Sequence, residues 1–389
     1  MKVAILGGGP SGAFAAEQLA SAGVQTVVLD EKLAWEKPCG GGLTYKAYAQ
    51  YPFLLDNDTP KKLITETVLA AAKNRVTLAL DHPLVIYSRF DLNALLLDRA
   101  QRAGAQLEKT RVTGIERADG TWVLRTKAGV LEADYCVVAT GARNTLRDLG
   151  TELGAGDTMT AMGYFIPGQR ERIDIQFFKG FEGYIWVFPR CGHLSVGICG
   201  KGEPASSLRS RLEKYIDEQG LTREGASFYG HVLPNLETAA WKHNRVAGEG
   251  WLAVGDAAGL VDPITGEGLY YAIRSADLAA KAILSETIDL AGNAYRKLLR
   301  RDFMSDLEFG SRLAKRVFHG SFLWGSVTSR MIQFTKLSPR FRSIMQDLFA
   351  GTQPYIGLKH RVMENLNGSL LEIICNLGLR KLIPGRDAA

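Results

Sequence analysis

Two glycine-rich segments constrain what this chain can fold into more than any other feature, one at the N-terminus and one that begins at Gly255. The first has the spacing Gly7-x-Gly9-x-x-Gly12 and lies between an apolar run and an alanine-rich stretch at 11–22. In a strand–loop–helix unit, such glycines permit a tight turn, a close approach of backbone to a pyrophosphate, and close packing of helix on strand. The free N–H groups at the helix start then face the phosphates. The segment predicts a dinucleotide site, with a chance glycine-rich turn as the alternative.

An acidic pair follows the second apolar run, at 26–29. Asp30 and Glu31 stand where a carboxylate can accept hydrogen bonds from the ribose of an adenosine. This arrangement of strand, glycines, helix, strand and acid is common to FAD and nicotinamide sites. It therefore does not distinguish the two cofactors.

The second glycine-rich segment, at 255–268, supplies that distinction. Asp256 follows a buried strand expected at 251–254, where its carboxylate can hydrogen-bond a ribityl hydroxyl. Pro263 and the turn through Gly266 open the next helix, whose N-terminus can stabilise negative charge on a flavin ring. A nicotinamide enzyme has no need of such a turn, so the two segments together predict an FAD site. A loop that merely ends a strand is the alternative.

Composition narrows the class of protein. The 389 residues, 46% hydrophobic and 23% charged, are enough for several subdomains and a sizeable core. The five cysteines are scattered without a C-x-x-C pair, which argues against a disulfide framework and favours a reducing, cytoplasmic setting. The six histidines show no metal-ligand spacing, so we expect no metal. We also expect no signal peptide and no membrane span, because no uncharged apolar run reaches about 18–20 residues.

The order of helix and strand patterns predicts an α+β protein in three parts. We expect a discontinuous Rossmann-like FAD domain, a β-rich substrate domain inserted into it, and a helical C-terminal domain; their ranges are 1–65, 86–150 and 245–290 for the first, 66–85 and 151–244 for the second, and 291–389 for the third. The helical domain is expected to break at Gly310, Gly320, Pro339 and Pro354.

Charge is unevenly placed along the chain. Residues 296–389 hold 16 Lys/Arg and 7 Asp/Glu, a net +9, so residues 1–295 carry −3 of the total of +6. Solvated helix faces explain this excess as well as a basic surface that meets an anionic lipid or an anionic substrate. The basic stretches lack the aromatic interleaving of nucleic-acid binders, so we expect no nucleic-acid partner.

Several segments resemble the flavoproteins of the aromatic-hydroxylase, or glutathione-reductase-like, superfamily over residues 1–290. Arg89-x-x-Leu92-Asn93-x-x-Leu96 resembles the superfamily's helix whose arginine approaches the cofactor. Residues 139–143 resemble its strand-end motif beside the FAD pyrophosphate. With these motifs, the residues expected at the cofactor are Gly7, Gly9, Pro10, Ser11, Gly12, Asp30, Glu31, Cys39, Gly40, Gly42, Arg89, Val112, Thr140, Gly141, Gly255, Asp256, Pro263, Gly266, Gly268 and Leu269.

Two further segments resemble the geranylgeranyl reductase family. One is Pro38–Leu43, a loop that in this family runs beside the flavin ring and that holds Cys39 among glycines. The other is similar to the family's Tyr-x-Trp-x-Phe-Pro substrate-pocket motif and consists of Tyr184, Trp186, Phe188 and Pro189. The chain departs from the family at Phe181, where a proline is frequent, and has Gly259 where aromatic hydroxylases commonly have histidine.

The resemblance implies an FAD-dependent reductase that saturates carbon–carbon double bonds of a polyprenyl lipid, diphosphate or quinone, with hydride from the reduced flavin N5. It implies NADPH or a ferredoxin-type protein as electron donor, and it leaves peripheral contact with a membrane open. Cys39 and Glu267 are the expected catalytic residues. The residue patterns alone also fit an inert Cys39 and ordinary sheet packing of the aromatic side chains. A flavin monooxygenase or halogenase is the competing enzyme, and a flavin-binding sensor or scaffold is the non-catalytic alternative.

Overall fold

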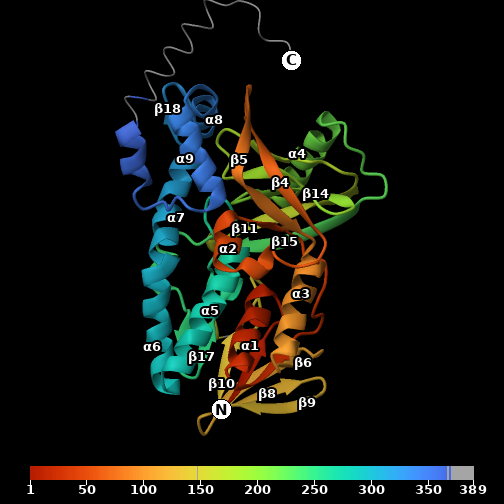
Figure 1. Ribbon diagram of the computed structural model, residues 1–389, viewed down its shortest axis with the longest axis vertical. Helices are drawn as coiled ribbons and strands as arrows, with labels where there is room; N and C mark the ends of the chain where they lie inside the picture. Colours follow the sequence, from red (N-terminus) through yellow and green to blue (C-terminus); the bar gives the residue numbers. More distant parts are fainter. Residues whose placement is uncertain (147, 366–367, 369–389) are drawn as a thin grey trace, which may run out of the picture.

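A computed structural model describes residues 1–146, 148–365 and 368. Figure 1 shows an elongated molecule with one sheet near the N-terminus, a second sheet beside the first, and a row of helices along one side. The end of the expected helical domain at 291–389, with Cys375, lies outside the described residues.

The first sheet has the strand order β16-β17-β10-β1-β2-β6, and all neighbours are parallel except β16 and β17. Its strands are β1 (Lys2–Leu6), β2 (Gln25–Leu29), β6 (Gln106–Glu108), β10 (Tyr135–Val138), β16 (Ala247–Gly248) and β17 (Trp251–Ala253). A three-stranded meander connects β6 to β10, and consists of β7 (Val112–Ala118), β8 (Thr121–Thr126) and β9 (Gly129–Ala133).

Helices bury the faces of this parallel sheet, which is why β1 and β10 are almost continuously apolar. They are α1 (Pro10–Ser21), α3 (Arg89–Arg102) and α5 (Leu269–Ser285), and α1 packs against both of the others. The helix expected at 11–22 is confirmed to within a residue at each end, and the helix expected at the Arg89 motif begins at Arg89. This Rossmann-like half, with the second sheet and the C-terminal helices, confirms the expected α+β class.

The second sheet has the order β15-β11-β14-β13-β12-β4-β5-β3, antiparallel except between β12 and β4. Its strands are β3 (Gly42–Leu43), β4 (Lys61–Ala71), β5 (Asn74–Tyr87), β11 (Thr158–Pro167), β12 (Ile173–Phe177), β13 (Gly183–Pro189), β14 (His193–Gly200) and β15 (Ser227–Pro234). Helix α4 (Ala205–Glu218) covers one face, where Ile185 and Val187 join its apolar side chains in a core cluster. The alternate residues of β13 therefore face the other way.

The expected boundaries at 65/66 and 85/86 fall inside strands of this sheet. Strands β4 and β5 pair from Lys61 with Tyr87 to Ala71 with Asn74. Residues 61–65 and 86–87 thus belong to the second sheet, because the hairpin is longer than its apolar pattern indicates.

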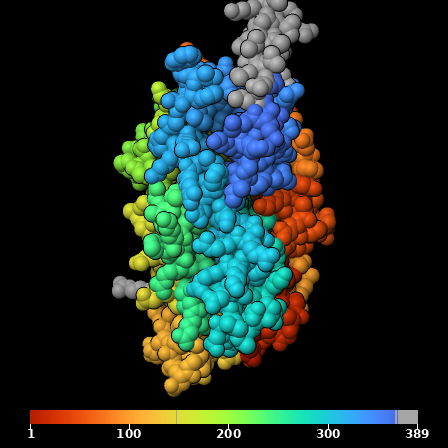
Figure 2. All heavy atoms as spheres, turned by 90° about the vertical axis from the view of Figure 1, so that its left-hand side faces the viewer, coloured from red at the N-terminus to blue at the C-terminus, as the bar shows by residue number. Residues whose placement is uncertain are grey.

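The C-terminal helices run along one side of the molecule, the face seen in Figure 2. They are α6 (Ile288–Leu299), a π-helical turn (Arg300–Met304), α7 (Ser305–His319), α8 (Val327–Leu337) and α9 (Pro339–Ala350), with a hairpin of β18 (Ser321–Phe322) and β19 (Gly325–Ser326) between α7 and α8. The breaks expected at Gly320 and Pro339 are confirmed.

The break expected at Gly310 is wrong, since α7 passes through it without interruption. A Cβ added at Gly310 would lie 2.7 Å from Cδ2 of Tyr355, so the glycine permits a close approach between segments. Among the described residues, the remaining elements are α2 (Tyr45–Gln50), a helical stretch at 358–365, and 3-10 turns at Pro52–Leu54, Ala155–Asp157, Ala240–His243 and Gly255–Ala258.

Candidate functional site

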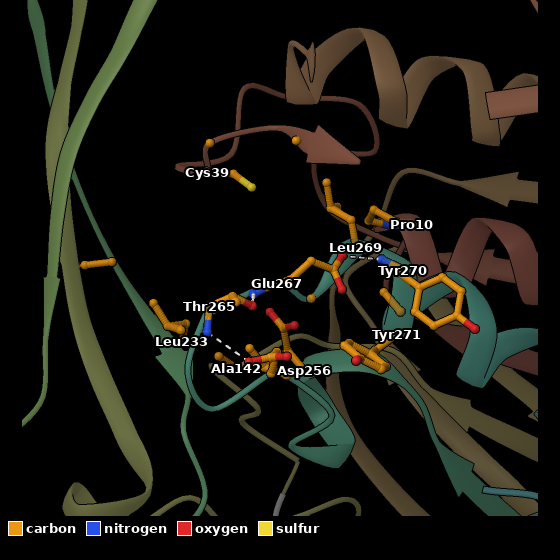
Figure 3. Close-up of a pocket in the computed structure, with 18 of the residues that line it drawn as sticks. Pro10, Cys39, Ala142, Leu233, Asp256, Thr265, Glu267, Leu269, Tyr270 and Tyr271 are labelled. Carbon is orange, nitrogen blue, oxygen red and sulfur yellow. Dashed lines mark hydrogen bonds between the residues drawn. The ribbon is translucent and has the colours of Figure 1, made fainter. Parts of the chain in front are cut away.

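One cavity of about 860 Å³ lies where the two sheets and the C-terminal helices meet. Its lining begins at the N-terminal glycine loop, continues along the Cys39 loop and the second glycine segment, and ends among α7, α8 and α9. Figure 3 shows its central part, where Cys39 and Glu267 face the cavity from opposite sides. The cavity therefore joins parts of the chain that are far apart in sequence.

The N-terminal loop has the geometry that its glycines require. Gly7 has φ +114°, and a Cβ there would lie 2.3 Å from the carbonyl oxygen of Ala139. A Cβ at Gly12 would lie 1.9 Å from the carbonyl oxygen of Gly7. Around Gly9, by contrast, a Cβ would meet no described atom within 4 Å, and this residue lines the cavity. The start of α1 is thus left open to a ligand, as a pyrophosphate site needs.

The two acidic residues, Asp30 and Glu31, make different contacts. Asp30 accepts hydrogen bonds from the backbone N–H groups of Gly8, Lys32 and Leu33, each at 2.7 Å, so its carboxylate holds the loop together. Both residues line the cavity, and the carboxylate of Glu31, which holds no N–H group of the described loop, lies 3.8 Å from the guanidinium of Arg111. Glu31 is therefore the better placed of the two for a ribose.

Four buried polar atoms at this end have no hydrogen-bond partner among the described residues, although their residues line the cavity. They are Nε of Arg89, Oγ1 of Thr110, Oγ1 of Thr140 and Nε2 of His231. Buried polar atoms are nearly always paired in proteins, so this set indicates a polar ligand. Together with the open start of α1, it fits FAD, whose phosphates and hydroxyls offer many hydrogen-bonding atoms.

A buried ion pair joins the Cys39 loop to the second glycine segment. Lys37 Nζ donates to Asp256 Oδ2 at 3.2 Å. Burial is the largest single influence and favours the neutral form of Asp256, but the charge and hydrogen bond of Lys37, with further contributions that include the charge of Arg89, together hold the pKa of the carboxyl below its usual value. Burial, followed by the charge of Lys37, lowers the pKa of nearby His231 to about 3, so this imidazole is neutral. Sequence reasoning missed Lys37 because its partner lies far along the chain.

The backbone of Cys39 is fixed by two side chains from the β13–β14 hairpin of the second sheet. The fully buried Arg190 donates to the carbonyl oxygen of Cys39 and to the carboxylate of Glu36, and Ser195 Oγ donates to the same carbonyl at 3.1 Å. The ring of Phe188 packs against Gly40 and Gly42, where a Cβ would lie 3.3 Å and 3.0 Å from it. The thiol is thereby presented to the cavity (Figure 3). Arg190 carried no recognisable sequence signal.

The second glycine segment is held in place by hydrogen bonds within the segment and from Tyr184 and Tyr355. Tyr184 donates its hydroxyl hydrogen to the carbonyl oxygen of Thr265, beside Gly266 with φ +68°. The buried Asp262 accepts from the N–H of Thr265 at 2.8 Å and from the hydroxyl of Tyr355 at 2.8 Å. The helix expected to open at Gly266 begins instead at Leu269, so residues 266–268 form a turn that leads into it.

Glu267 occupies the N-terminus of α5, where its Oε1 accepts from the backbone N–H of Tyr270 at 2.7 Å. Burial, with a further contribution from the charge of Asp262, raises the pKa of Glu267 to about 7. The residue lines the cavity opposite Cys39. The structure thus brings the two residues expected to be catalytic to one cavity, and gives one of them a pKa suited to proton transfer.

The aromatic residues of β13 face the cavity in the expected alternation: Tyr184, Trp186 and Phe188 line it, while Pro189 is buried beside Leu194 of β14 and does not. Most residues expected at the cofactor also line the cavity. The exceptions, which lie behind the lining, are Gly12, Gly255 and Pro263. At Gly255 a Cβ would lie 3.1 Å from Oγ of Ser11, so this glycine acts through packing.

The far end of the cavity is apolar. Side chains from the second sheet and from α7, α8 and α9 line it, namely Leu69, Ile175 and Phe177 with Leu313, Val317, Met331, Ile332, Met345, Leu348 and Phe349. No Lys or Arg of α7, α8 or α9 is among the lining residues that the structure describes. Sequence analysis left solvated helix faces and a basic surface both open for this region, and it missed the apolar lining because periodic apolar positions on a helix predict burial but not a pocket.

Two other features are not found in the part of the chain that the structure describes. None of its helices combines the length and the apolarity that a membrane span requires. None of its His, Cys, Asp and Glu side chains gather in a group of three or more that could hold a metal ion.

Comparisons with known proteins agree with this site. The family model for pyridine nucleotide-disulphide oxidoreductases matches residues 1–165. The chain is 30% identical over 322 residues to the chloroplastic geranylgeranyl diphosphate reductase of Oryza sativa, covering 73% of this chain and 66% of the rice protein. It is 28% identical over 318 residues to digeranylgeranylglycerophospholipid reductase 2 of Methanothermobacter thermautotrophicus, covering 74% of this chain and 80% of the relative.

Solved structures share the fold. A geranylgeranyl bacteriochlorophyll reductase-like protein from Thermoplasma acidophilum superposes with a TM-score of 0.75 at 20% identity, covering 93% of this chain and 98% of the other. A flavin-dependent brominase superposes with a TM-score of 0.69 at 16% identity, covering 94% and 99%. The sequence relatives, together with the FAD-compatible cavity, identify the chain as a member of the geranylgeranyl reductase family of flavin-dependent oxidoreductases.

Proposed function

We propose that this protein is an FAD-dependent reductase that saturates carbon–carbon double bonds of a polyprenyl chain. The observation that carries the proposal is the division of one continuous cavity, whose cofactor end has unpaired polar atoms and whose other end is apolar. A long hydrocarbon fits the apolar end, and its transfer from water is favourable in proportion to the apolar area buried. The two relatives are named as reductases of geranylgeranyl diphosphate and of a digeranylgeranylglycerophospholipid. These names support the same substrate class for this protein.

The residues at the polar end would hold FAD by its phosphates, ribose and ribityl chain. We assign the pyrophosphate to the start of α1 with Arg89 and Thr140, a ribose to Glu31, and the ribityl chain to Asp256. When bound and reduced, FAD supplies a hydride to an alkene carbon. An electron donor such as NADPH or a ferredoxin-type protein is required in turn.

Addition of hydride to one alkene carbon leaves the other carbon in need of a proton, and Glu267 is our first choice of donor. With a pKa of about 7, its carboxylic acid is present in quantity at neutral pH. The thiol of Cys39 across the cavity is the second choice. Both residues are held in place, Glu267 by the N–H of Tyr270 and Cys39 through its clamped carbonyl.

Alignment of the alkene is the main task of the aromatic wall. An isolated double bond is a poor hydride acceptor, so a large part of the rate must come from holding it in reactive geometry. The rings of Tyr184 and Trp186 contact each other at 6.1 Å between centroids, and Phe177 lies 6.0 Å from Tyr184. This wall leads from the turn at Thr265 towards the apolar end, and it would exclude water from the reacting atoms.

The experiment is an anaerobic single turnover. FAD-loaded protein is reduced with dithionite and mixed with geranylgeranyl diphosphate or a polyprenyl quinone, and flavin absorbance and product mass are followed. We expect reoxidation without oxygen, and a product that gains the mass of two hydrogen atoms for each reduced bond. If the flavin is reoxidised only by dioxygen and an oxygenated product forms, the protein is a monooxygenase and the proposal is wrong.

Two variants then separate the proton donors. Glu267→Gln should slow the single turnover while FAD stays bound, and Cys39→Ala should slow it less. The reverse order would assign the proton to Cys39.

A further inference from the structure

The hairpin between α7 and α8 ends in an exposed apolar tip, at Phe322, Leu323 and Trp324. The relative exposures of these side chains are 46%, 44% and 99%. A tryptophan without protein contacts is unusual, because folded proteins seldom leave a large apolar side chain wholly in water. The tip therefore points to a partner that supplies an apolar environment.

The backbone of the tip is strained, and a neighbouring side chain holds it in the strained conformation. Leu323 and Trp324 both have positive φ, 46° and 58°, in a two-residue turn for which Asn and Gly are the usual residues. Arg330 donates to the carbonyl oxygens of Phe322 and Leu323 and packs beside Gly325, where a Cβ would lie 2.8 Å from its Nε. An arginine thus holds the turn in a conformation that projects bulky apolar side chains outward.

The segment of the chain that carries the tip is basic. Residues 311–346 contain seven Lys/Arg and no Asp or Glu, the seven being Arg312, Lys315, Arg316, Arg330, Lys336, Arg340 and Arg342. Some of these charges are offset by acids elsewhere, as Lys315 is by Glu237. Even so, the segment around the tip carries an excess of positive charge, which attracts an anionic lipid surface.

The tip also adjoins the apolar end of the cavity. Thr328, two residues beyond the hairpin, lines the cavity, as do Met331 and Ile332 on the next turn of α8. Figure 1 shows β18 and α8 together at the end of the molecule remote from the N-terminus. An aromatic ring from the tip, Phe322, contacts Phe334 of α8 at 6.2 Å between centroids.

We propose that the Phe322–Trp324 tip inserts into the surface of an anionic lipid bilayer and docks the apolar end of the cavity there. Trp and Phe are favoured at the boundary between headgroups and acyl chains, and neighbouring Lys and Arg add attraction to anionic headgroups. A polyprenyl chain dissolved in the bilayer would then enter the cavity without crossing water. The role of this docking in substrate entry rests on the proposed function. The binding to the bilayer does not depend on turnover.

The test uses the full-length, FAD-loaded protein with vesicles of phosphatidylcholine, with or without phosphatidylglycerol, and measures binding by flotation. The wild type should bind the anionic vesicles. The double variant Leu323→Ser/Trp324→Ser should bind them about 100-fold more weakly, because it loses two large apolar side chains from the bilayer. The matched control, Leu284→Ser/Leu290→Ser, removes two leucines of 46% and 52% exposure on α5 and α6 and should bind like the wild type.

Two further sets of variants test the contribution of basic residues to vesicle binding and the insertion of Trp324 into the bilayer. Arg316→Glu/Lys336→Glu should weaken binding to anionic vesicles by about tenfold or more, since each basic residue contributes about 1 kcal/mol there. Trp324→Phe should bind like the wild type but lose the blue shift of tryptophan emission that vesicles cause.

Several outcomes would overturn the inference. They are wild-type protein that does not float with anionic vesicles, a serine double variant that binds as well as its control, and a tip variant that turns a dimer into a monomer without lipid. The last would assign the tip to a second copy of the chain. Failure of the proposed function is seen separately, as absence of alkene reduction with detergent-dispersed substrate, and it leaves the flotation result unchanged.

Discussion

The two ends of the cavity are built by different means. At the cofactor end, contacts are set by the backbone, where Gly7 and Gly12 touch neighbouring carbonyl groups that leave no room for a Cβ. At the apolar end, side chains from α7, α8 and α9 set the lining, and several of them are only half-buried. The first end tolerates almost no change of residue, whereas the second accepts many residues of similar polarity. The cofactor is therefore fixed more tightly by the chain than the substrate is.

The largest effect should come from Gly12→Ala at the rigid end. Its Cβ would lie 1.9 Å from a carbonyl oxygen that cannot move away, so we expect a loss of about 3 kcal/mol or more in the free energy of unfolding and no bound FAD. Thermal unfolding and the flavin content of the purified protein measure both.

Gly9→Ala is the matched control, because a Cβ at Gly9 meets no described atom. It should leave the apoprotein as stable as the wild type and weaken only FAD binding. If both variants destabilised the protein equally, it would be wrong that Gly12 is required for packing and Gly9 only for contact with the ligand.

Lys37→Met should have the next largest effect, because it leaves the carboxylate of Asp256 without its ion-pair partner. Breaking a buried pair costs about 3 kcal/mol, measured as unfolding free energy at neutral pH. The folded-state pKa of Asp256 lies below its ordinary value, so the stabilisation is present above the unfolded pKa and is lost as the pH falls through the folded one. The gap between wild type and variant should therefore close in acid, below about pH 4. A gap that is constant with pH would show that the pair is not the cause.

Glu267→Gln tests the proposed proton donor, which lies between the cofactor end and the apolar end of the cavity. We expect the single-turnover rate of alkene reduction to fall by about 100-fold, the usual contribution of a general acid. Since the pKa of Glu267 is raised to about 7, the acid form predominates below that pH, and the wild-type rate should decline as the pH rises through it. The variant should lack this decline. A variant with the wild-type pH profile would exclude Glu267 as the donor.

Val317→Trp should have the smallest effect, at the apolar end. The larger side chain shortens the cavity beside α7, so turnover of a geranylgeranyl chain should fall by about tenfold. Turnover of a shorter geranyl chain should not change. Leu290→Trp, on the exposed side of α6, is the control and should alter neither substrate.

The sequence made the cofactor end predictable because its chemistry depends on local order. The strand, the glycine spacing and the helix of the N-terminal unit stand within a short stretch, and the structure confirms all three. Lys37 and Arg190 were missed because each acts on a residue far away in sequence, Asp256 and Cys39 respectively. No local pattern reports such a pairing.

The apolar end was predicted least well, for a different reason. A helix position such as Val317 or Leu348 has the same residue type whether it faces a core or a cavity, so its pattern predicts burial but not a pocket. Gly310 misled in the same way, because a glycine that permits a close contact with Tyr355 looks like a helix break. The turn at Leu323 and Trp324 carries no hairpin signal, since neither residue favours positive φ.

We propose that the polar end of the cavity holds FAD and the apolar end holds a polyprenyl chain, so that the two react inside one cavity. Anaerobic single turnover of the reduced protein with geranylgeranyl diphosphate, followed in wild type and Val317→Trp, tests this most directly. We expect flavin reoxidation without oxygen, a product richer by two hydrogen atoms per reduced bond, and slower reoxidation in the variant. A flavin that stays reduced until oxygen is admitted, or a rate that is the same in both proteins, would contradict it.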